Sequence, residues 1–180
     1  DVFDDSAELK PMECEPLKVE LRDDVKPIAV QSPPSIAHAF LPKVKEAIED
    51  MVKRGIIEKV TYPTEHVSPI VVAPKPNGGV RICQDYRNIN KYTKRPWYPM
   101  KTPREVIDRL PPKARFFTTF DAKNGYWMLP LHPDSQDLTT FICFSGRYKF
   151  LRAPMGLNVV QDDFDCKFDM AFEGMPNTGI

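Results

Sequence analysis

The sequence has few cysteines and histidines, and those it has are scattered. Its four cysteines and three histidines stand far apart and form no Cys-x-x-Cys pair, so we expect neither a zinc site nor a disulfide framework. It also lacks a run of about 18 apolar residues and a basic-then-apolar leader, which argues against a transmembrane helix and a signal peptide. These absences predict a reduced, intracellular protein with no membrane partner.

Acidic and basic residues balance overall, at 25 each, but they are unevenly placed. Residues 1–24 carry nine acidic and three basic side chains, whereas residues 75–115 carry eleven basic and three acidic ones, a net charge of +8. Residues 158–180 are acidic again, with a net charge of −4. A central basic block suits a polyanionic partner such as nucleic acid or a nucleoside triphosphate. A solvated charged face is the alternative interpretation.

The pattern divides the chain into an arm and one domain. Residues 1–38 are acidic, contain several prolines and show no sustained period, so we expect an extended linker or arm there. Residues 39–180 form the predicted domain. It opens with apolar residues at helical spacing, which predict a helix over about residues 39–52 that ends near Gly55.

Two hairpins are predicted in the domain. Runs of β-forming residues at 67–73 and 80–83 flank an Asn-Gly pair at residues 77–78, which is typical of a β-hairpin. A second pair of runs, residues 139–144 and 148–153, predicts another hairpin with a Ser-Gly turn.

The remaining signals predict two helices and one strand. Thr102 and Glu105 are spaced as a capping box for a short helix. Residues 115–121 (RFFTTFD) are expected to form a buried strand that ends in a carboxylate. Asn158 and Gln161 are expected to cap a last helix. Its apolar stripe consists of Val160, Phe164, Phe168 and Phe172. The fold class is therefore α+β, with helices packed on a mainly antiparallel sheet.

Four stretches then occur in one order: HVSPIVVAPKPNGGVRICQDYRNINKYTKRPWYPMKTP, FFTTFDAKNGYWMLPL, LTTFICFSGRYKFLRAPMGLN and AFEGMP. This series resembles the reverse transcriptases of Ty3/gypsy-type long-terminal-repeat retrotransposons, encoded in a Pol polyprotein. The resemblance runs from about Pro42 to the end of the chain. It implies a partial right-hand polymerase fold that contains the fingers and the first part of the palm. It also implies a cytoplasmic particle or the nucleus as the location.

The implied activity is RNA-directed DNA polymerisation. Nucleotidyl transfer uses two metal ions that stabilise the attacking and leaving oxygens, and Mg²⁺ prefers carboxylate oxygen ligands. By the resemblance, Asp121 is the first catalytic residue and a ligand of Mg²⁺. A strand-end or helix-capping aspartate is the alternative for that residue taken alone.

The resemblance also implies nucleotide-binding residues. Lys75 and Arg81, on either side of the Asn-Gly turn, would grip the triphosphate of the incoming dNTP. Tyr126 would lie under its sugar and exclude a 2′-hydroxyl, while Ala122 and Met155 would complete the nucleotide site. Solvated cations and a core tyrosine are the plain alternatives.

A second implied set binds the RNA or DNA template–primer. Arg87 and Lys91 would contact the backbone phosphates. Pro154 and Gly156 belong to a turn that would pack against the nascent base pair, where glycine permits close approach of the backbone. Two departures weaken the expected template contacts: Val159 follows where the family has small residues, and the last helix is unusually acidic.

The family's catalytic Asp-Asp pair would follow residue 180. Asp162 and Asp163 do not replace it, because neighbours on a helix point about 100° apart; we expect them on a polar helix face. The chain alone is therefore expected to be inactive as a polymerase, and whether it acts as an enzyme stays open. A partner chain or oligomer is expected to cover an exposed palm edge. The alternative is a domesticated module that binds nucleic acid or protein without catalysis.

Overall fold

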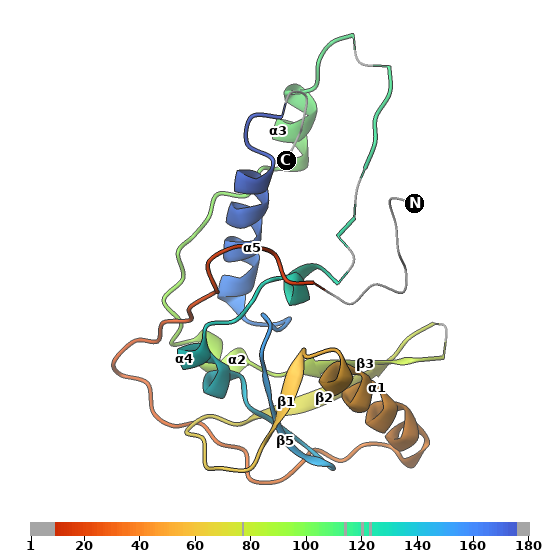
Figure 1. The fold of residues 1–180 in the computed structure, drawn as a ribbon, viewed down its shortest axis with the longest axis vertical. Coiled ribbons are helices and arrows are strands. Elements are labelled where there is room, and N and C mark those ends of the chain that lie inside the picture. Colours follow the sequence, from red (N-terminus) through yellow and green to blue (C-terminus); the bar gives the residue numbers. More distant parts are fainter. Residues whose placement is uncertain (1–9, 77, 114, 120, 123, 176–180) are drawn as a thin grey trace.

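The computed structural model describes residues 10–175 except positions 77, 114, 120 and 123. A mixed five-stranded sheet forms one end of the molecule (Figure 1), in the strand order β1-β5-β4-β2-β3. The strands are β1 (Ile57–Val60), β2 (Ser68–Pro74), β3 (Val80–Gln84), β4 (Phe141–Cys143) and β5 (Gly146–Phe150). The pairs β1–β5, β5–β4 and β2–β3 are antiparallel, and only β2–β4 is parallel among the described strands. The predicted α+β class is confirmed.

The helices are short apart from two. The α-helices are α1 (Leu41–Lys53), α2 (Arg87–Asn90), α3 (Pro103–Asp108), α4 (Pro133–Gln136) and α5 (Asn158–Ala171), and the 3₁₀ turns are η1 (His38–Phe40), η2 (Gly125–Met128) and η3 (Asp137–Thr139). Figure 1 shows α5 rising away from the sheet, with α3 beside its far end. Within the described ranges, no helix combines the length and the apolar character needed to cross a membrane.

The core includes the contact between α1 and the sheet and extends to the arm and the base of α5. Val44, Ile48 and Met51 are the buried residues of α1, at the helical spacing that placed this helix in the sequence. They join the sheet residues Phe141 and Phe150, whose rings lie 5.5 Å apart between centroids. The predicted first helix and both predicted hairpins are confirmed.

The predicted strand at residues 115–121 is wrong for the residues that the structure describes. Residues 115–119 and Asp121 lie in no helix or strand. Phe116 is 92% exposed and Phe117 65% exposed, and the segment forms a long loop beyond α3 (Figure 1). A run of β-forming residues becomes a strand only where a neighbour takes up its backbone hydrogen bonds, and no described strand pairs with this segment.

The last helix differs from its prediction in two ways, in its N-cap and in the burial of Asp162. Leu157 is the N-cap and makes no side-chain capping bond; Asn158 instead bonds the backbone of Asn90 through its side chain. Asp162 does not lie on a polar face, because it is 1% exposed. The apolar stripe is confirmed, since the Phe164–Phe168 and Phe168–Phe172 ring centroids lie 5.4 and 4.8 Å apart.

The short helix α3 confirms its capping box. The Thr102 N–H donates to Glu105 Oε2 at 2.6 Å, and the Glu105 N–H donates to Thr102 Oγ1 at 3.3 Å. The pKa of the Glu105 carboxyl is lowered first by the hydrogen bond from the Thr102 backbone N–H and then by one from the Thr102 hydroxyl to Glu105 Oε2, at 2.8 Å. The cap therefore contributes stability above the unfolded pKa of Glu105 and loses it as the pH falls through the lowered one.

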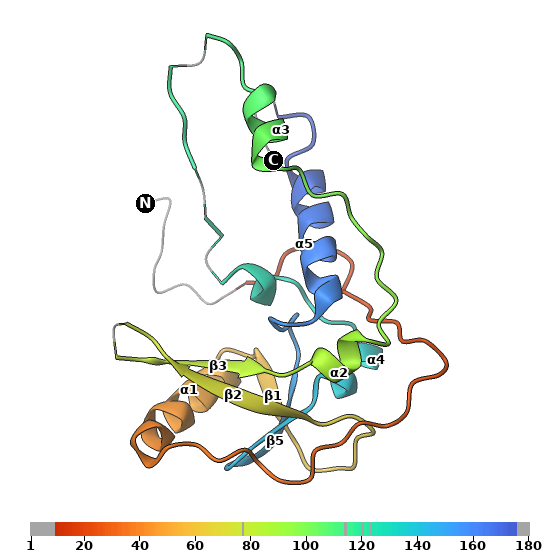
Figure 2. The ribbon, with the colours of Figure 1, turned by 180° about the vertical axis from the view of Figure 1, so that it is seen from behind.

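The N-terminal arm packs against the domain. Its described part runs from α5 along the sheet (Figure 2), and isolated bridges pair Leu17 with Leu131, Leu21 with Thr93 and Ala29 with Val67. Leu17 and Val19 are buried in the core. The division of the chain at residue 38 into an arm and a domain stays a prediction.

Truncating the buried arm residue tests whether the arm stabilises the domain. Leu17→Ala is expected to lower the free energy of unfolding by about 2–5 kcal/mol, because it removes buried methyl groups and leaves a cavity. Val52→Ala is the control, since Val52 is 43% exposed and its truncation should change stability by about 0.5 kcal/mol or less. Equal losses in urea unfolding curves would refute a structural role for the arm.

Candidate nucleic-acid and nucleotide site

The β2–β3 hairpin presents two exposed cations. Lys75 and Arg81 are both exposed, and neither forms an ion pair with a described residue. Lys75 closes the turn, since its N–H donates to the Gly79 carbonyl at 2.8 Å and its own carbonyl accepts from Gly78 at 3.0 Å. Lys43 on α1 donates to the Gly78 carbonyl at 2.6 Å. The cations thus stand on a hairpin whose tip is fastened to α1.

The α2 region carries Arg87 and Lys91. Arg87 is 85% exposed and donates to Asp85 through Nε at 2.8 Å and Nη2 at 2.6 Å. The side-chain hydrogen bond from Arg87 is the main cause that lowers the pKa of the Asp85 carboxyl. Lys91 donates only to Asn88 Oδ1, at 3.4 Å. Lys91 is therefore the less engaged cation of the two.

The turn that contains Pro154, Met155 and Gly156 is fixed by α2. The side chain of Asn90 donates to the Gly156 carbonyl at 2.8 Å and accepts from the Asn158 N–H at 3.1 Å. Gly156 has a φ of +99°, and a Cβ there would lie 3.3 Å from the Gln84 carbonyl oxygen. Pro154 is buried and Met155 is half exposed, at 50%. The sequence indicates the turn but not the role of Asn90 in holding it. Asn90 and Gly156 are 66 residues apart, and no local pattern marks their contact.

Tyr126 lies against α5. It belongs to η2, and its ring meets Phe164 edge-on with centroids 5.3 Å apart. Its hydroxyl is hydrogen-bonded to Gln161 Oε1, while Gln161 Nε2 donates to Asp165 at 2.8 and 2.9 Å. Burial raises the pKa of the Tyr126 hydroxyl, and the charge of Asp165 raises it further. The ring is held in one orientation by these contacts.

An ion pair that the sequence did not reveal joins the basic block to a buried carboxylate of α5. Arg95 donates to Asp162 through Nε at 2.5 Å and Nη2 at 3.1 Å. The guanidinium of Arg95 lies over the Trp97 ring, with its Cζ atom 4.3 Å from the ring centroid. Trp97 has a φ of +55°. The sequence placed Asp162 on a helix but could not supply its partner 67 residues away.

Asp121 stands apart from these groups. It is exposed and makes no hydrogen bond or ion pair with a described residue, and Ala122 beside it accepts the Gly125 N–H at 3.2 Å. Among the described residues, no group of three or more His, Cys, Asp or Glu side chains could hold a metal ion. The described residues do not by themselves fit the expected pair of metal ions.

The structure therefore gathers the predicted residues into three places. Arg87, Lys91 and the 154–156 turn are connected through α2. Tyr126 is connected to α5, and the two hairpin cations are connected to α1. No hydrogen bond or ion pair between described residues joins Asp121 to any of the three.

Comparisons with known proteins identify relatives of this chain. Residues 73–160 match the family described as reverse transcriptase (RNA-dependent DNA polymerase). The chain is 28% identical over 178 residues, 91% of its length, to the retrovirus-related Pol polyprotein from transposon 412 of Drosophila melanogaster. It spans 14% of that polyprotein.

Solved structures agree with the fold. The prototype foamy virus protease–reverse transcriptase superposes with a TM-score of 0.75 at 25% identity, over 86% of this chain and 20% of that one. A foamy viral protease–reverse transcriptase in complex with double-stranded DNA gives a TM-score of 0.68 at 26% identity, over 84% of this chain and 25% of that one. The partial polymerase fold expected from the sequence is thereby confirmed.

Separating Arg95 from Asp162 tests this ion pair. Arg95→Ala is expected to lower the free energy of unfolding by about 1–3 kcal/mol, because it leaves the buried carboxylate of Asp162 without its charged hydrogen-bond donor. Arg104→Ala is the matched control: Arg104 is 91% exposed, its pair with Asp108 is 4.0 Å long, and its loss should cost about 0–1 kcal/mol. If both variants melt alike, the ion pair does not hold α5 in place.

Proposed function

Because the chain is related to the reverse transcriptase domain of retroelement Pol polyproteins, we propose that it supplies the fingers and the first part of the palm of an RNA-directed DNA polymerase. One observation carries the proposal: the segment that matches the family, residues 73–160, contains the basic hairpin, α2, η2 and the 154–156 turn. A Ty3/gypsy-type retrotransposon is the proposed source, on the motifs quoted from the sequence.

The hairpin is proposed to bind the triphosphate of the incoming dNTP. Lys75 and Arg81 are exposed and carry no intramolecular ion pair among the described residues, so their charges are available to an anionic ligand. Cations fixed near a triphosphate stabilise charge that develops during transfer. Tyr126 is proposed to stand under the sugar, and its two-sided contact with α5 supports this, because a discriminating ring must not move aside. Ala122 and Met155 are the remaining proposed nucleotide contacts.

The α2 region is proposed to bind the template–primer. Lys91 is exposed at the end of α2, and Asn90 connects α2 to the turn of Pro154 and Gly156. A rigid turn beside exposed cations suits a duplex, whose phosphates meet the cations while the base pair meets the turn. Arg87 shares its charge with Asp85 and is the weaker candidate.

Asp121 is proposed as one carboxylate of a Mg²⁺ site completed outside the described residues. Asp121 is exposed and has no partner among the described residues, so both of its oxygens are available there. The second candidate function is a domesticated module that binds nucleic acid without catalysis, through the same exposed cations of the β2–β3 hairpin and α2. The two differ only in chemistry, so binding alone does not separate them.

Lys91→Ala tests the template–primer surface. The chain is expected to bind a fluorescently labelled RNA/DNA hybrid with an affinity that falls steeply with salt, because bound phosphates release counterions. The variant should reduce the slope of log K against log salt by about 1. Lys53→Ala, an exposed lysine on α1 outside the basic block, should leave the slope unchanged. Failure to bind the hybrid, or equal effects of both variants, would count against the proposal.

Asp121→Asn tests the catalytic proposal. Primer extension on an RNA template with Mg²⁺, by the longest Pol product that contains these residues, should fall by on the order of 10²-fold or more, the scale on which one charge-stabilising group acts. Hybrid binding should be retained. Asp108→Asn, an exposed carboxylate on α3, is the control. Binding without extension in the unmodified protein would favour the non-catalytic module.

A further inference from the structure

One aspartate of α5 differs from the other three. Asp162, Asp163 and Asp169 each form an ion pair, at 2.5, 2.5 and 3.7 Å. Asp165 forms none with a described residue, although it is partly buried. Its hydrogen bonds within the described ranges come from Gln161, whose Nε2 donates to the two carboxylate oxygens at 2.8 and 2.9 Å. The charge of Asp165 is therefore directed at a neutral amide one turn earlier on the helix.

This carboxylate sets the direction of the Gln161 amide. An ionised carboxylate only accepts hydrogen bonds, so the donor end of the amide, Nε2, faces Asp165. The acceptor end, Oε1, then faces the hydroxyl of Tyr126, which donates to it. The two ends of an amide have nearly the same shape, and only their hydrogen-bond partners distinguish them. Asp165 thus ensures that Tyr126 meets an acceptor on α5.

The hydrogen bond completes the support of the Tyr126 ring. Phe164 meets the ring edge-on, with centroids 5.3 Å apart, and Gln161 holds the hydroxyl at the tip. Burial raises the pKa of that hydroxyl, and the charge of Asp165 raises it further, so the phenol keeps the proton that it donates. One contact restrains the side of the ring and the other restrains its tip.

Gln161 depends on this restraint because it borders a cavity. The cavity has a volume of ≈ 260 Å³ and lies between α5, residues 98–101 and Val106 of α3. Both Gln161 and Asp165 line it. A side chain with free space beside it has several staggered rotamers open to it. Without the carboxylate, the amide could turn into the cavity and leave the Tyr126 hydroxyl without its acceptor.

We propose that Asp165 and Gln161 are positioning residues for selection of the nucleotide sugar. The inference rests on the proposed function, in which Tyr126 stands under the sugar of the incoming nucleotide. Exclusion of a 2′-hydroxyl requires a ring that does not yield, and the relay from Asp165 through Gln161 holds the tip of that ring. The preference for deoxynucleotides over ribonucleotides then depends in part on a carboxylate outside the proposed nucleotide contacts.

The measurement is the ratio of kcat/KM for a dNTP to that for the matching rNTP. It uses primer extension by the longest Pol product that contains these residues. Asp165→Leu removes the acceptor and keeps a helix-forming residue, whereas Tyr126→Phe removes the hydroxyl and keeps the ring. Each should lower the ratio about 2- to 10-fold, the size of one net hydrogen bond. The double variant should lower it no further, because both changes break the same connection. Additive losses would overturn the inference.

A charge exchange should restore the relay. Gln161→Glu alone brings two carboxylates together and is expected to lower the selectivity ratio. When it is combined with Asp165→Asn, the introduced glutamate accepts from Tyr126 with one oxygen and from the introduced amide with the other. The ratio should then return to within about twofold of the unmodified protein, since one hydrogen bond again holds the ring. Failure of this rescue would contradict the relay.

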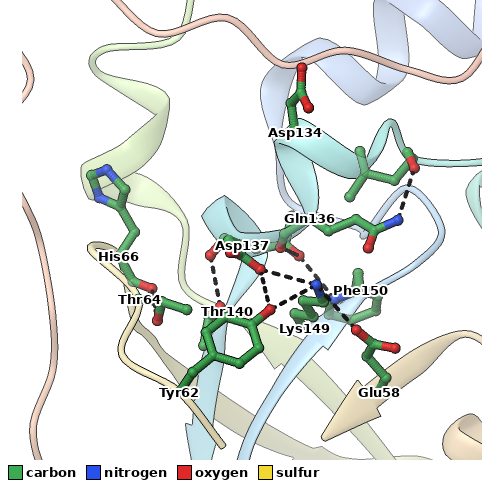
Figure 3. A network of polar contacts seen from close by, with 12 residues as sticks. Glu58, Tyr62, Thr64, His66, Asp134, Gln136, Asp137, Thr140, Lys149 and Phe150 are labelled. Atoms are coloured by element: carbon green, nitrogen blue, oxygen red, sulfur yellow. Dashed lines mark hydrogen bonds and ion pairs between the residues drawn. The ribbon is translucent and has the colours of Figure 1, made fainter. Parts of the chain in front are cut away.

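Tyr62 supplies a matched control away from α5. Figure 3 shows its hydroxyl beside Asp137 of η3 and Lys149 of β5. It donates to Asp137 at 2.7 Å and accepts from Lys149 Nζ at 2.9 Å. Tyr62→Phe therefore removes a hydrogen-bonded tyrosine hydroxyl, as Tyr126→Phe does, but leaves the proposed relay intact. The selectivity ratio of this control should equal that of the unmodified protein.

NMR of ¹³C-labelled tyrosine rings tests the contact in the intact chain, independently of polymerase activity. Asp165→Leu should lower the pKa of the Tyr126 hydroxyl, because it removes a charge that raises this pKa, and an unchanged pKa would overturn the inference. A lowered pKa with an unchanged selectivity ratio would also overturn it and leave the proposed function standing. Absence of primer extension by the unmodified Pol product would overturn the proposed function, and the inference with it.

Discussion

The attachment of α5 to the sheet body is the constraint on which the candidate site depends. That helix rises away from the sheet (Figure 1), so apolar packing at its base cannot alone fix its direction. Polar contacts along the helix contribute: Arg95 pairs with Asp162 near the base, and Tyr98 and Lys101 contact Asp169 further along. Since Tyr126 is oriented by α5, contacts that touch no ligand help to set where the proposed sugar contact lies.

The two proposed binding surfaces are held with different rigidity. The 154–156 turn is fixed by side-chain bonds from Asn90 and by close backbone packing at Gly156. The β2–β3 hairpin is held at its tip by a lysine on the surface, a contact worth little against solvent. These two levels of restraint agree with the proposed roles, in which the turn packs against the template–primer and the hairpin cations meet the nucleotide triphosphate.

Sequence patterns predicted what is decided locally and missed what is decided by distant partners. The capping box of α3, the Asn-Gly hairpin and the apolar face of α1 are encoded within a few residues, and each formed as expected. Residues 115–119 have the composition of a strand, but no described strand lies beside them to complete the pairing. The burial of Asp162 and the packing of the arm depend on residues far along the chain. For the candidate site, motifs in the sequence identified the residues. The contacts that orient those residues could be seen only in the structure.

The arm also has a consequence for synthesis of the chain. Val19 donates its backbone N–H to Ser135 Oγ, a partner 116 residues further on, and Leu17 pairs with Leu131. At a translation rate of roughly 5–20 residues per second, on the order of ten seconds pass before these partners leave the ribosome. During that interval the apolar side of the arm has nothing to pack against. Its many carboxylates and prolines keep such a waiting segment soluble and disfavour premature strand pairing.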